Sequence, residues 1–154
     1  MKNFLLSIFL LGCICFGFCA AEAGGLSTTF SEVTLENLEI GKTYSTKEIA
    51  GLPLELVNTG KQPINLKIEL VMPQESELKA GFEPIPDLSW IKLEKSEFSN
   101  IKPNTSAITD VVLSIPNKEK YRGKKYQGFI WSHTVGGSIG IGLKSKLLFA
   151  TKSE

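Results

Sequence analysis

Cysteine is almost absent from this chain of 154 residues. The three cysteines, Cys13, Cys15 and Cys19, all lie within the first nineteen positions. The rest of the sequence therefore has no thiol that could form a disulfide, bind zinc or act as a nucleophile. A domain without cross-links must be stabilised by its hydrophobic core, and the remaining stretch of roughly 130 residues is long enough to build one.

Histidine is equally scarce, because His133 is the one histidine of the chain. A zinc site needs several converging ligands, so we expect no metal and no cofactor. Ser132 and His133 are neighbours on a predicted strand, where adjacent side chains point to opposite faces, so they cannot form a catalytic pair. We identify no other catalytic set and expect that the protein is not an enzyme.

Charge of one sign is also lacking. The chain has 17 basic and 16 acidic residues and a formal net charge of +1. A balanced surface of this kind offers neither the basic patch that binds nucleic acid nor the one that binds an anionic membrane. We therefore expect no nucleic-acid partner.

The N-terminus has the pattern of a secretory signal peptide. Lys2 precedes an apolar run from Phe4 to Phe18, and small residues follow at Ala20, Ala21 and Ala23. A basic start, a short apolar run and an exit of small residues are typical of such leaders. We predict a signal peptide at 1–21, with cleavage after Ala21 or Ala23, and export to the periplasm or the extracellular space.

Two alternatives for this leader stay open. It could be retained as a membrane anchor, although the apolar run is shorter than the roughly 20 residues that cross a bilayer. The segment Leu10-Leu11-Gly12-Cys13 also resembles a bacterial lipobox. In a lipoprotein, Cys13 would carry the lipid and the protein would be attached to a membrane.

From Leu26 onward the apolar residues repeat every second position, which indicates strands. Ile64, Leu66, Ile68 and Leu70 alternate without error with Asn65, Lys67 and Glu69. We expect the first set to face the core and the second set to face solvent. The other predicted strands lie within Phe30–Ile40, Leu52–Val57, Trp90–Leu93, Ala107–Ile115, Tyr126–Val135 and Ser138–Phe149. We expect no helix beyond one short turn within Gln74–Gly81.

Several motifs resemble those of bacterial immunoglobulin-like domains, which are related in architecture to major sperm protein and pilus-chaperone domains. The motifs are Leu56-Val57-Asn58-Thr59-Gly60, Pro63-Ile64-Asn65-Leu66, Ile101-Lys102-Pro103-Asn104 before the strand that ends Leu113-Ser114-Ile115-Pro116, and the stretch from Tyr121 to Ile130. The resemblance and the strand pattern together predict an all-β fold. We expect a single immunoglobulin-like β-sandwich of seven to eight strands over residues 26–150, followed by a short polar tail at 151–154.

The resemblance implies a role as a spacer or binding module of envelope and surface proteins. We therefore expect an exported, non-enzymatic binding or assembly module of the bacterial cell envelope, with an envelope protein or a glycan as its partner. The alternative is a structural subunit of a surface polymer, joined by strand addition along an exposed sheet edge.

The glycine-rich segment near position 136 predicts how the last two strands pair. A two-residue turn at Gly136-Gly137 would suit the positive φ angles of a type I′ hairpin. Counting back from that turn pairs Val135 with Ser138, Thr134 with Ile139, His133 with Gly140, Trp131 with Gly142, Ile130 with Leu143 and Tyr126 with Leu147.

This pairing predicts a partner-binding surface. Ile139, Ile141, Leu143, Leu147 and Phe149 share one face and would fill the core. Phe129, Trp131 and His133 would then lie on the outer face, beside two glycines, as an aromatic platform for a glycan ring or a partner strand. The alternative is that these rings lie flat on the glycine backbone and only shield it.

Overall fold

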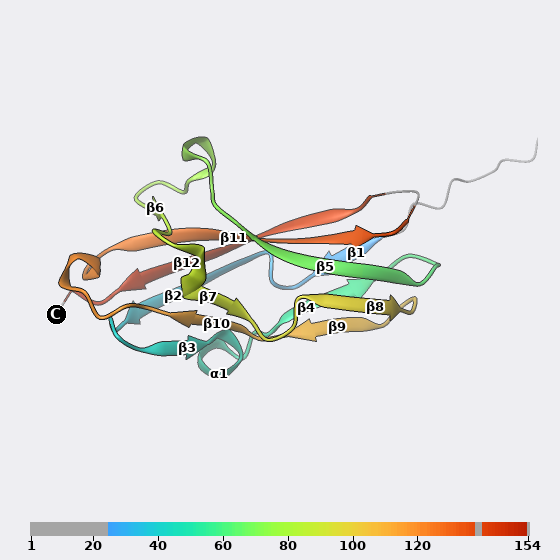
Figure 1. The fold of residues 1–154 in the computed structure, drawn as a ribbon, viewed down its shortest axis with the longest axis horizontal. Helices are drawn as coiled ribbons and strands as arrows, with labels where there is room; N and C mark the ends of the chain where they lie inside the picture. The colour runs from blue at the N-terminus through green and yellow to red at the C-terminus, as the bar shows by residue number, and fades with distance from the viewer. Residues whose placement is uncertain (1–24, 138–139, 154) are drawn as a thin grey trace, which may run out of the picture.

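The computed structural model describes residues 25–137 and 140–153 (Figure 1). The signal peptide predicted at 1–21, its cleavage sites and the lipidation alternative at Cys13 lie outside the described residues. Within the two described ranges, no helix has the length and apolar character needed to cross a membrane.

The described residues form an all-β fold, as the sequence predicts, with one short α-helix and three 3₁₀ turns. The elements are β1 (Leu26–Thr28), β2 (Glu32–Leu38), β3 (Thr43–Ser45), α1 (Thr46–Ala50), β4 (Leu54–Asn58), β5 (Ile64–Val71), η1 (Glu75–Glu77), β6 (Glu83–Pro84), η2 (Leu88–Trp90), β7 (Ile91–Leu93), β8 (Glu97–Ile101), β9 (Ser106–Thr109), β10 (Val111–Ser114), η3 (Glu119–Tyr121), β11 (Lys125–Val135) and β12 (Gly142–Thr151). Several of these strands have only two or three residues, so the strand count exceeds the seven or eight expected. Thr151, which the sequence assigned to the polar tail, is buried at the end of β12.

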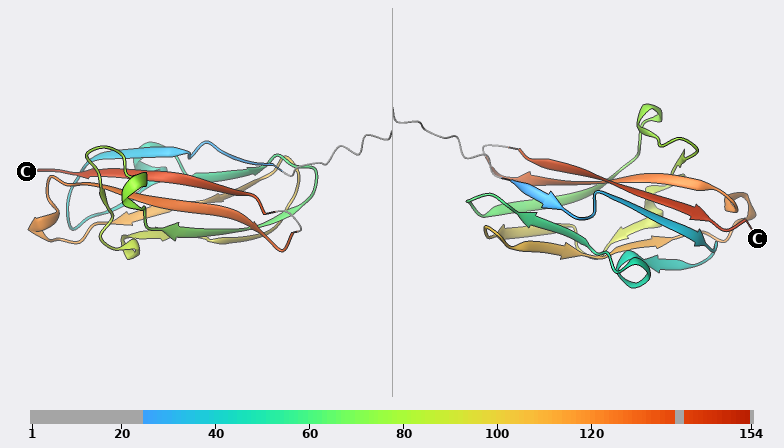
Figure 2. Two further views of the ribbon diagram at one scale, coloured as in Figure 1. Left: turned by 90° about the horizontal axis from the view of Figure 1, so that it is seen from above. Right: turned by 180° about the vertical axis from the view of Figure 1, so that it is seen from behind.

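The strands form two layers. Five strands pair in the order β2-β12-β11-β5-β8, and β6 joins β11 as the sixth strand of this sheet. The opposite layer consists of two three-stranded sheets, β1-β4-β9 and β3-β10-β7. They lie end to end, because the chain runs directly from β9 into β10, and they face the larger sheet across the core (Figures 1 and 2).

Strand β5 confirms the predicted alternation. Leu66 and Ile68 are buried in the core, with 1% and 3% of their surface exposed, and Asn65 is exposed on the other side. Ile64 and Leu70, at the two ends of the series, are half-buried and pack against the core. The period of two therefore assigned each face of this strand correctly.

The run Ala107–Ile115, expected as one strand, is divided at Asp110. The hydroxyl of Ser45 donates to Asp110 Oδ2 (2.6 Å), and the backbone N–H groups of Lys47 (3.2 Å) and Val111 (2.9 Å) donate to Oδ1. One carboxylate thus holds the start of α1 and the point where the chain passes from one small sheet to the other.

Helix α1 is absent from the predictions because it is too short to show a helical period. Its first turn is capped by Ser45, whose hydroxyl accepts a hydrogen bond from the N–H of Glu48 (3.1 Å). Its last turn ends at Gly51, which adopts the left-handed conformation with φ 65°. This five-residue helix is therefore stabilised by the caps at both of its ends.

The predicted pairing of β11 with β12 is wrong by two residues. His133 pairs with Gly142, Trp131 with Lys144, Ile130 with Ser145 and Tyr126 with Phe149. The turn is longer than two residues, because the N–H of Thr134 donates to the carbonyl of Ile141 (2.9 Å) and the hydroxyl of Thr134 accepts from the N–H of Ile141 (3.0 Å).

A shift of two positions preserves the faces of both strands. Leu147 and Phe149 are buried in the core as predicted, and Ile141 and Leu143 pack against it. The pairings expected for Ser138 and Ile139 lie outside the described residues.

We predict that Leu66→Ala lowers the free energy of unfolding by about 2–5 kcal/mol, because it leaves a cavity in the closed core. Lys67→Ala, the adjacent control, should change the denaturation midpoint little, since its ion pair lies at the surface. Urea denaturation of both variants measures the difference. Equal losses at the two positions would contradict the alternation.

We predict that Asp110→Ala destabilises the fold by about 1.5–3 kcal/mol, because hydrogen bonds to a charged acceptor are lost at both Lys47 and Val111. Asp110→Asn keeps one acceptor oxygen and should lose less. Thermal unfolding followed by circular dichroism tests this order. An alanine variant as stable as the parent would show that the carboxylate does not hold the junction.

Candidate functional site

The outer face of the large sheet is covered over part of its area by the loop that contains η1. The amide of Gln127, fully buried, donates to the carbonyl of Glu77 (3.0 Å) and accepts from the N–H of Lys79 (2.8 Å). Phe129 is also buried, and Lys144 Nζ lies 4.6 Å from the centre of its ring. Lys144 is held there by an ion pair with Glu77 (2.6 Å).

Phe129 therefore lies on the predicted face but is too buried to contact a partner. Trp131 and His133, the other two predicted residues, lie farther along β11 and are less buried than Phe129. The surface of Trp131 is 41% exposed. The two rings stack with their centres 4.4 Å apart and their planes at 30°. We call this pair of stacked rings the aromatic ledge.

The aromatic ledge depends on a glycine of the neighbouring strand. A Cβ atom built on Gly142 would lie 2.6 Å from Nε1 of Trp131, closer than real atoms approach. The indole therefore lies across the backbone of Gly142, as expected for a ring that shields a glycine. It nevertheless keeps much of its surface open to solvent.

A chain of charged groups flanks the ledge on β5. Nε2 of His133 lies 2.9 Å from Oε2 of Glu69, and Nζ of Lys67 lies 2.8 Å from Oε1 of the same carboxylate. Lys67 first, and His133 second, lower the pKa of the Glu69 carboxyl group. Glu69 therefore stays ionised to a lower pH than an isolated glutamate and holds both neighbours in place.

A shallow hollow of about 300 Å³ adjoins the ledge on the side of β8. It is lined by Asn65, Leu66, Lys67, Glu97, Phe98, Ser99 and Val135. Lys67 borders both the hollow and Glu69, and it pairs across the strands with His133 and Glu97. We call the ledge, Glu69, Lys67 and this hollow the outer-face site.

The outer-face site has the groups needed to bind a ligand. It combines a flat apolar ring with one carboxylate and one ammonium group, and its titratable groups are bonded to one another. In residues 25–137 and 140–153, no group of three or more histidine, cysteine, aspartate or glutamate side chains could hold a metal ion.

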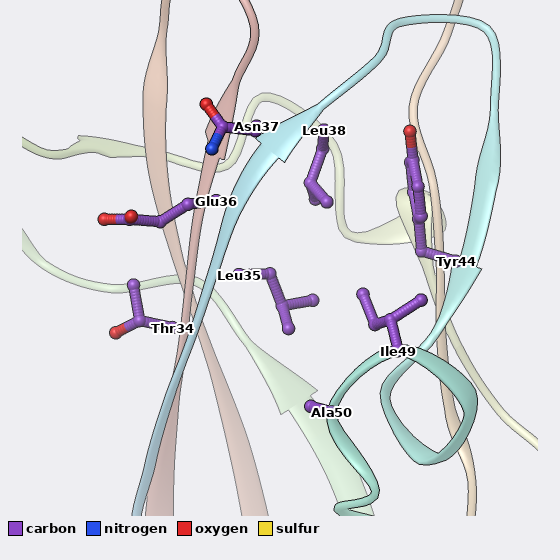
Figure 3. Close-up of a pocket in the computed structure, with 8 residues that line it drawn as sticks. All are labelled: Thr34, Leu35, Glu36, Asn37, Leu38, Tyr44, Ile49 and Ala50. Atoms are coloured by element: carbon purple, nitrogen blue, oxygen red, sulfur yellow. The ribbon is translucent and has the colours of Figure 1, made fainter.

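A second hollow, of about 340 Å³, lies between β2 and α1. Leu35, Leu38, Tyr44 and Ile49 point into it, whereas Thr34 and Glu36 point away (Figure 3). Its lining is therefore part apolar and part polar, and it follows the outer edge of the large sheet, where β2 lies.

Sequence reasoning missed Lys67 and Glu69 as members of the site. Both were predicted to face solvent, but nothing local indicates which strand lies beside β5. The pairing of Trp131 with Glu69 and of His133 with Lys67 joins segments more than sixty positions apart. The one local signal for these residues was the pair of opposite charges, two positions apart, on the solvent face of β5.

No protein-family model matches the sequence, and no curated protein matches it. Solved structures do resemble it. The ASH / PapD-like domain of human CEP192 (PapD-like domain 7) has a TM-score of 0.60 at 12% identity, over 99% of this chain and 100% of that one. The E. coli chaperone DraB has a TM-score of 0.52 at 13% identity, over 84% of this chain and 56% of that one.

A putative carbohydrate binding protein from Bacteroides ovatus has a TM-score of 0.58 at 12% identity, over 82% of this chain and 37% of that one. This chain thus spans little more than half of the chaperone and a smaller share of the Bacteroides protein. Identities this low establish the fold alone, which is the immunoglobulin-like sandwich found in PapD-like domains.

We predict that Gly142→Ala displaces the indole of Trp131, because the new Cβ would collide with Nε1. Acrylamide should then quench Trp131 fluorescence more strongly, as judged against Trp131→Phe, in which only the buried Trp90 emits. Gly140→Ala is the control, since no atom of the described residues lies within 4 Å of a Cβ built on Gly140. Equal quenching in both alanine variants would contradict the packing of the ring on Gly142.

Proposed function

We propose that this protein is an exported, non-enzymatic binding module of the bacterial cell envelope, and that the outer-face site contacts its partner. The observation that carries the proposal is the exposed indole of Trp131, held flat by His133 and by the backbone of Gly142. A rigid aromatic surface loses little conformational freedom on binding, which makes it an effective contact.

Other features support the same role. The leader pattern at 1–21 favours export, and the mature chain would then contain the sandwich that ends with β12 at Thr151. Chaperones and a putative carbohydrate binding protein are among the structures with this fold. The partner under this proposal is an envelope protein or a glycan, bound by Trp131 and His133, whereas Phe129 on the same face is covered by Lys144 and does not contact it.

The second candidate function, a polymer subunit joined by strand addition, has one specific observation in its favour. Within the described ranges, β2 has β12 as its one strand partner, so its other edge is unpaired beside the hollow of Figure 3. This edge is short, because Asn37 has a φ of 58° and the N–H of Glu39 donates to the hydroxyl of Tyr44 (2.7 Å). Such interruptions protect an edge from pairing, and we therefore favour the outer-face site.

The test is sedimentation of the purified protein with a bacterial envelope fraction. We expect Trp131→Ala to weaken binding about tenfold or more, as truncation of an aromatic anchor does. Ile108→Ala is the matched control, because Ile108 is 55% exposed but lies on the opposite layer. Thermal melts of both variants verify that they are folded.

Unchanged binding by Trp131→Ala would overturn the proposal. Size-exclusion chromatography over a range of concentrations tests the second candidate at the same time. A ladder of oligomers that disappears in Ile49→Asp, which places a charge in the β2 hollow, would favour the polymer subunit instead.

A further inference from the structure

We propose that the ligand of the outer-face site is an uncharged carbohydrate, an inference that rests on the proposed function. One sugar ring would stack its C–H face on the indole of Trp131. The hydroxyl groups at its rim would bond to the carboxylate of Glu69 and the ammonium group of Lys67. The inference follows from the size, the polarity and the charge of the site.

The exposed apolar area is too small for a protein interface. Stable protein interfaces bury about 800 Å² on each partner and have several apolar anchors at their centre. On the described strands of the outer face, the large apolar side chains in the exposed class are Trp131 and Val135, with 41% and 38% of their surface exposed. Phe129, which could have enlarged the patch, is buried beneath Lys144.

The polar groups are arranged to complement a sugar. A pyranose has an apolar face and a rim of hydroxyl groups, each of which can donate and accept hydrogen bonds. The aromatic ledge offers a flat surface to the apolar face of the sugar. Glu69 and Lys67 form an ion pair, with Nζ 2.8 Å from Oε1. They therefore offer the hydroxyl groups of the sugar an acceptor and a donor side by side. About two-fifths of each side chain is exposed, so both can be reached from solvent.

The charges around the ledge favour an uncharged ligand. The positive charge of Lys67 and the negative charge of Glu69 neutralise each other, and Lys144 is likewise paired with Glu77. An anionic or cationic ligand would have to compete with these existing partners. A neutral hydroxyl can instead add a hydrogen bond to either group without separating the pair.

The adjoining hollow extends the site beyond one ring. It continues from Lys67 toward Asn65, Glu97 and Phe98, and its volume is about 300 Å³. A second sugar unit could lie there against the side chain of Val135, with its hydroxyl groups toward Asn65 and Glu97. We therefore expect oligosaccharides to bind more tightly than monosaccharides.

The first experiment uses defined sugars. Cellohexaose, chitohexaose and maltohexaose are titrated into the purified protein by calorimetry, with trigalacturonate as the anionic comparison. We expect at least one neutral hexaose to bind, and trigalacturonate to bind at least tenfold more weakly than that hexaose.

Variants then link this binding to the site. Trp131→Ala should abolish binding, Trp131→Phe should retain part of it, and Glu69→Gln should weaken it about tenfold. Ile108→Ala, on the opposite layer, should leave it unchanged. Equal affinity of all four variants, or binding of none of the neutral sugars, would overturn the carbohydrate assignment.

A second experiment separates this inference from the proposed function. The envelope fraction is treated either with periodate, which cleaves vicinal diols of sugars, or with protease, before the sedimentation assay. We expect Trp131-dependent binding to be lost after periodate and kept after protease. The opposite result would identify a protein partner, so the carbohydrate inference would fail while the proposed function would stand. Binding that never depends on Trp131 would overturn both.

Discussion

Strand β11 is hydrogen-bonded along both edges, to β12 on one side and to β5 and β6 on the other, and the two faces of the molecule depend on this pairing. A strand paired on both sides cannot rotate or slip by one residue without turning every side chain over. Tyr126 and Ile130 are therefore held in the core, and Trp131 and His133 are held outward. The same pairing therefore fixes the orientation of the proposed binding surface and of the core side chains behind it.

The fold could be predicted from local features wherever the alternation was regular. Leu66 and Ile68 on β5 illustrate this, because a period of two needs no knowledge of the neighbouring strand. The junction at Asp110 could not be predicted in this way. Its carboxylate bonds to Ser45, more than sixty positions away in the sequence, and nothing within the run Ala107–Ile115 indicates that contact.

In the candidate site, too, the features set by the local sequence could be predicted, and those set by distant segments could not. The alternation along β11 was enough to place Trp131 and His133 on the outer face. The predicted pairing was wrong by two residues, and a shift of two leaves the faces unchanged. The burial of Phe129 did not follow, because it depends on Lys144 and on the loop that carries Glu77. Pairing between β5 and β11 likewise decides that Glu69 lies beside His133, and sequence periodicity contains no information on that pairing.

The parallel pairing of β2 with β12 has a consequence for the order in which the chain folds. Val33 lies opposite Leu147 and Leu35 opposite Phe149, and all four side chains are buried. The core therefore cannot close until a strand near the end of the chain has reached one near its beginning. Contacts between such distant segments form slowly, because a long loop must close first. A chain threaded through a membrane in extended form would, with this topology, remain unfolded until its last strand had emerged.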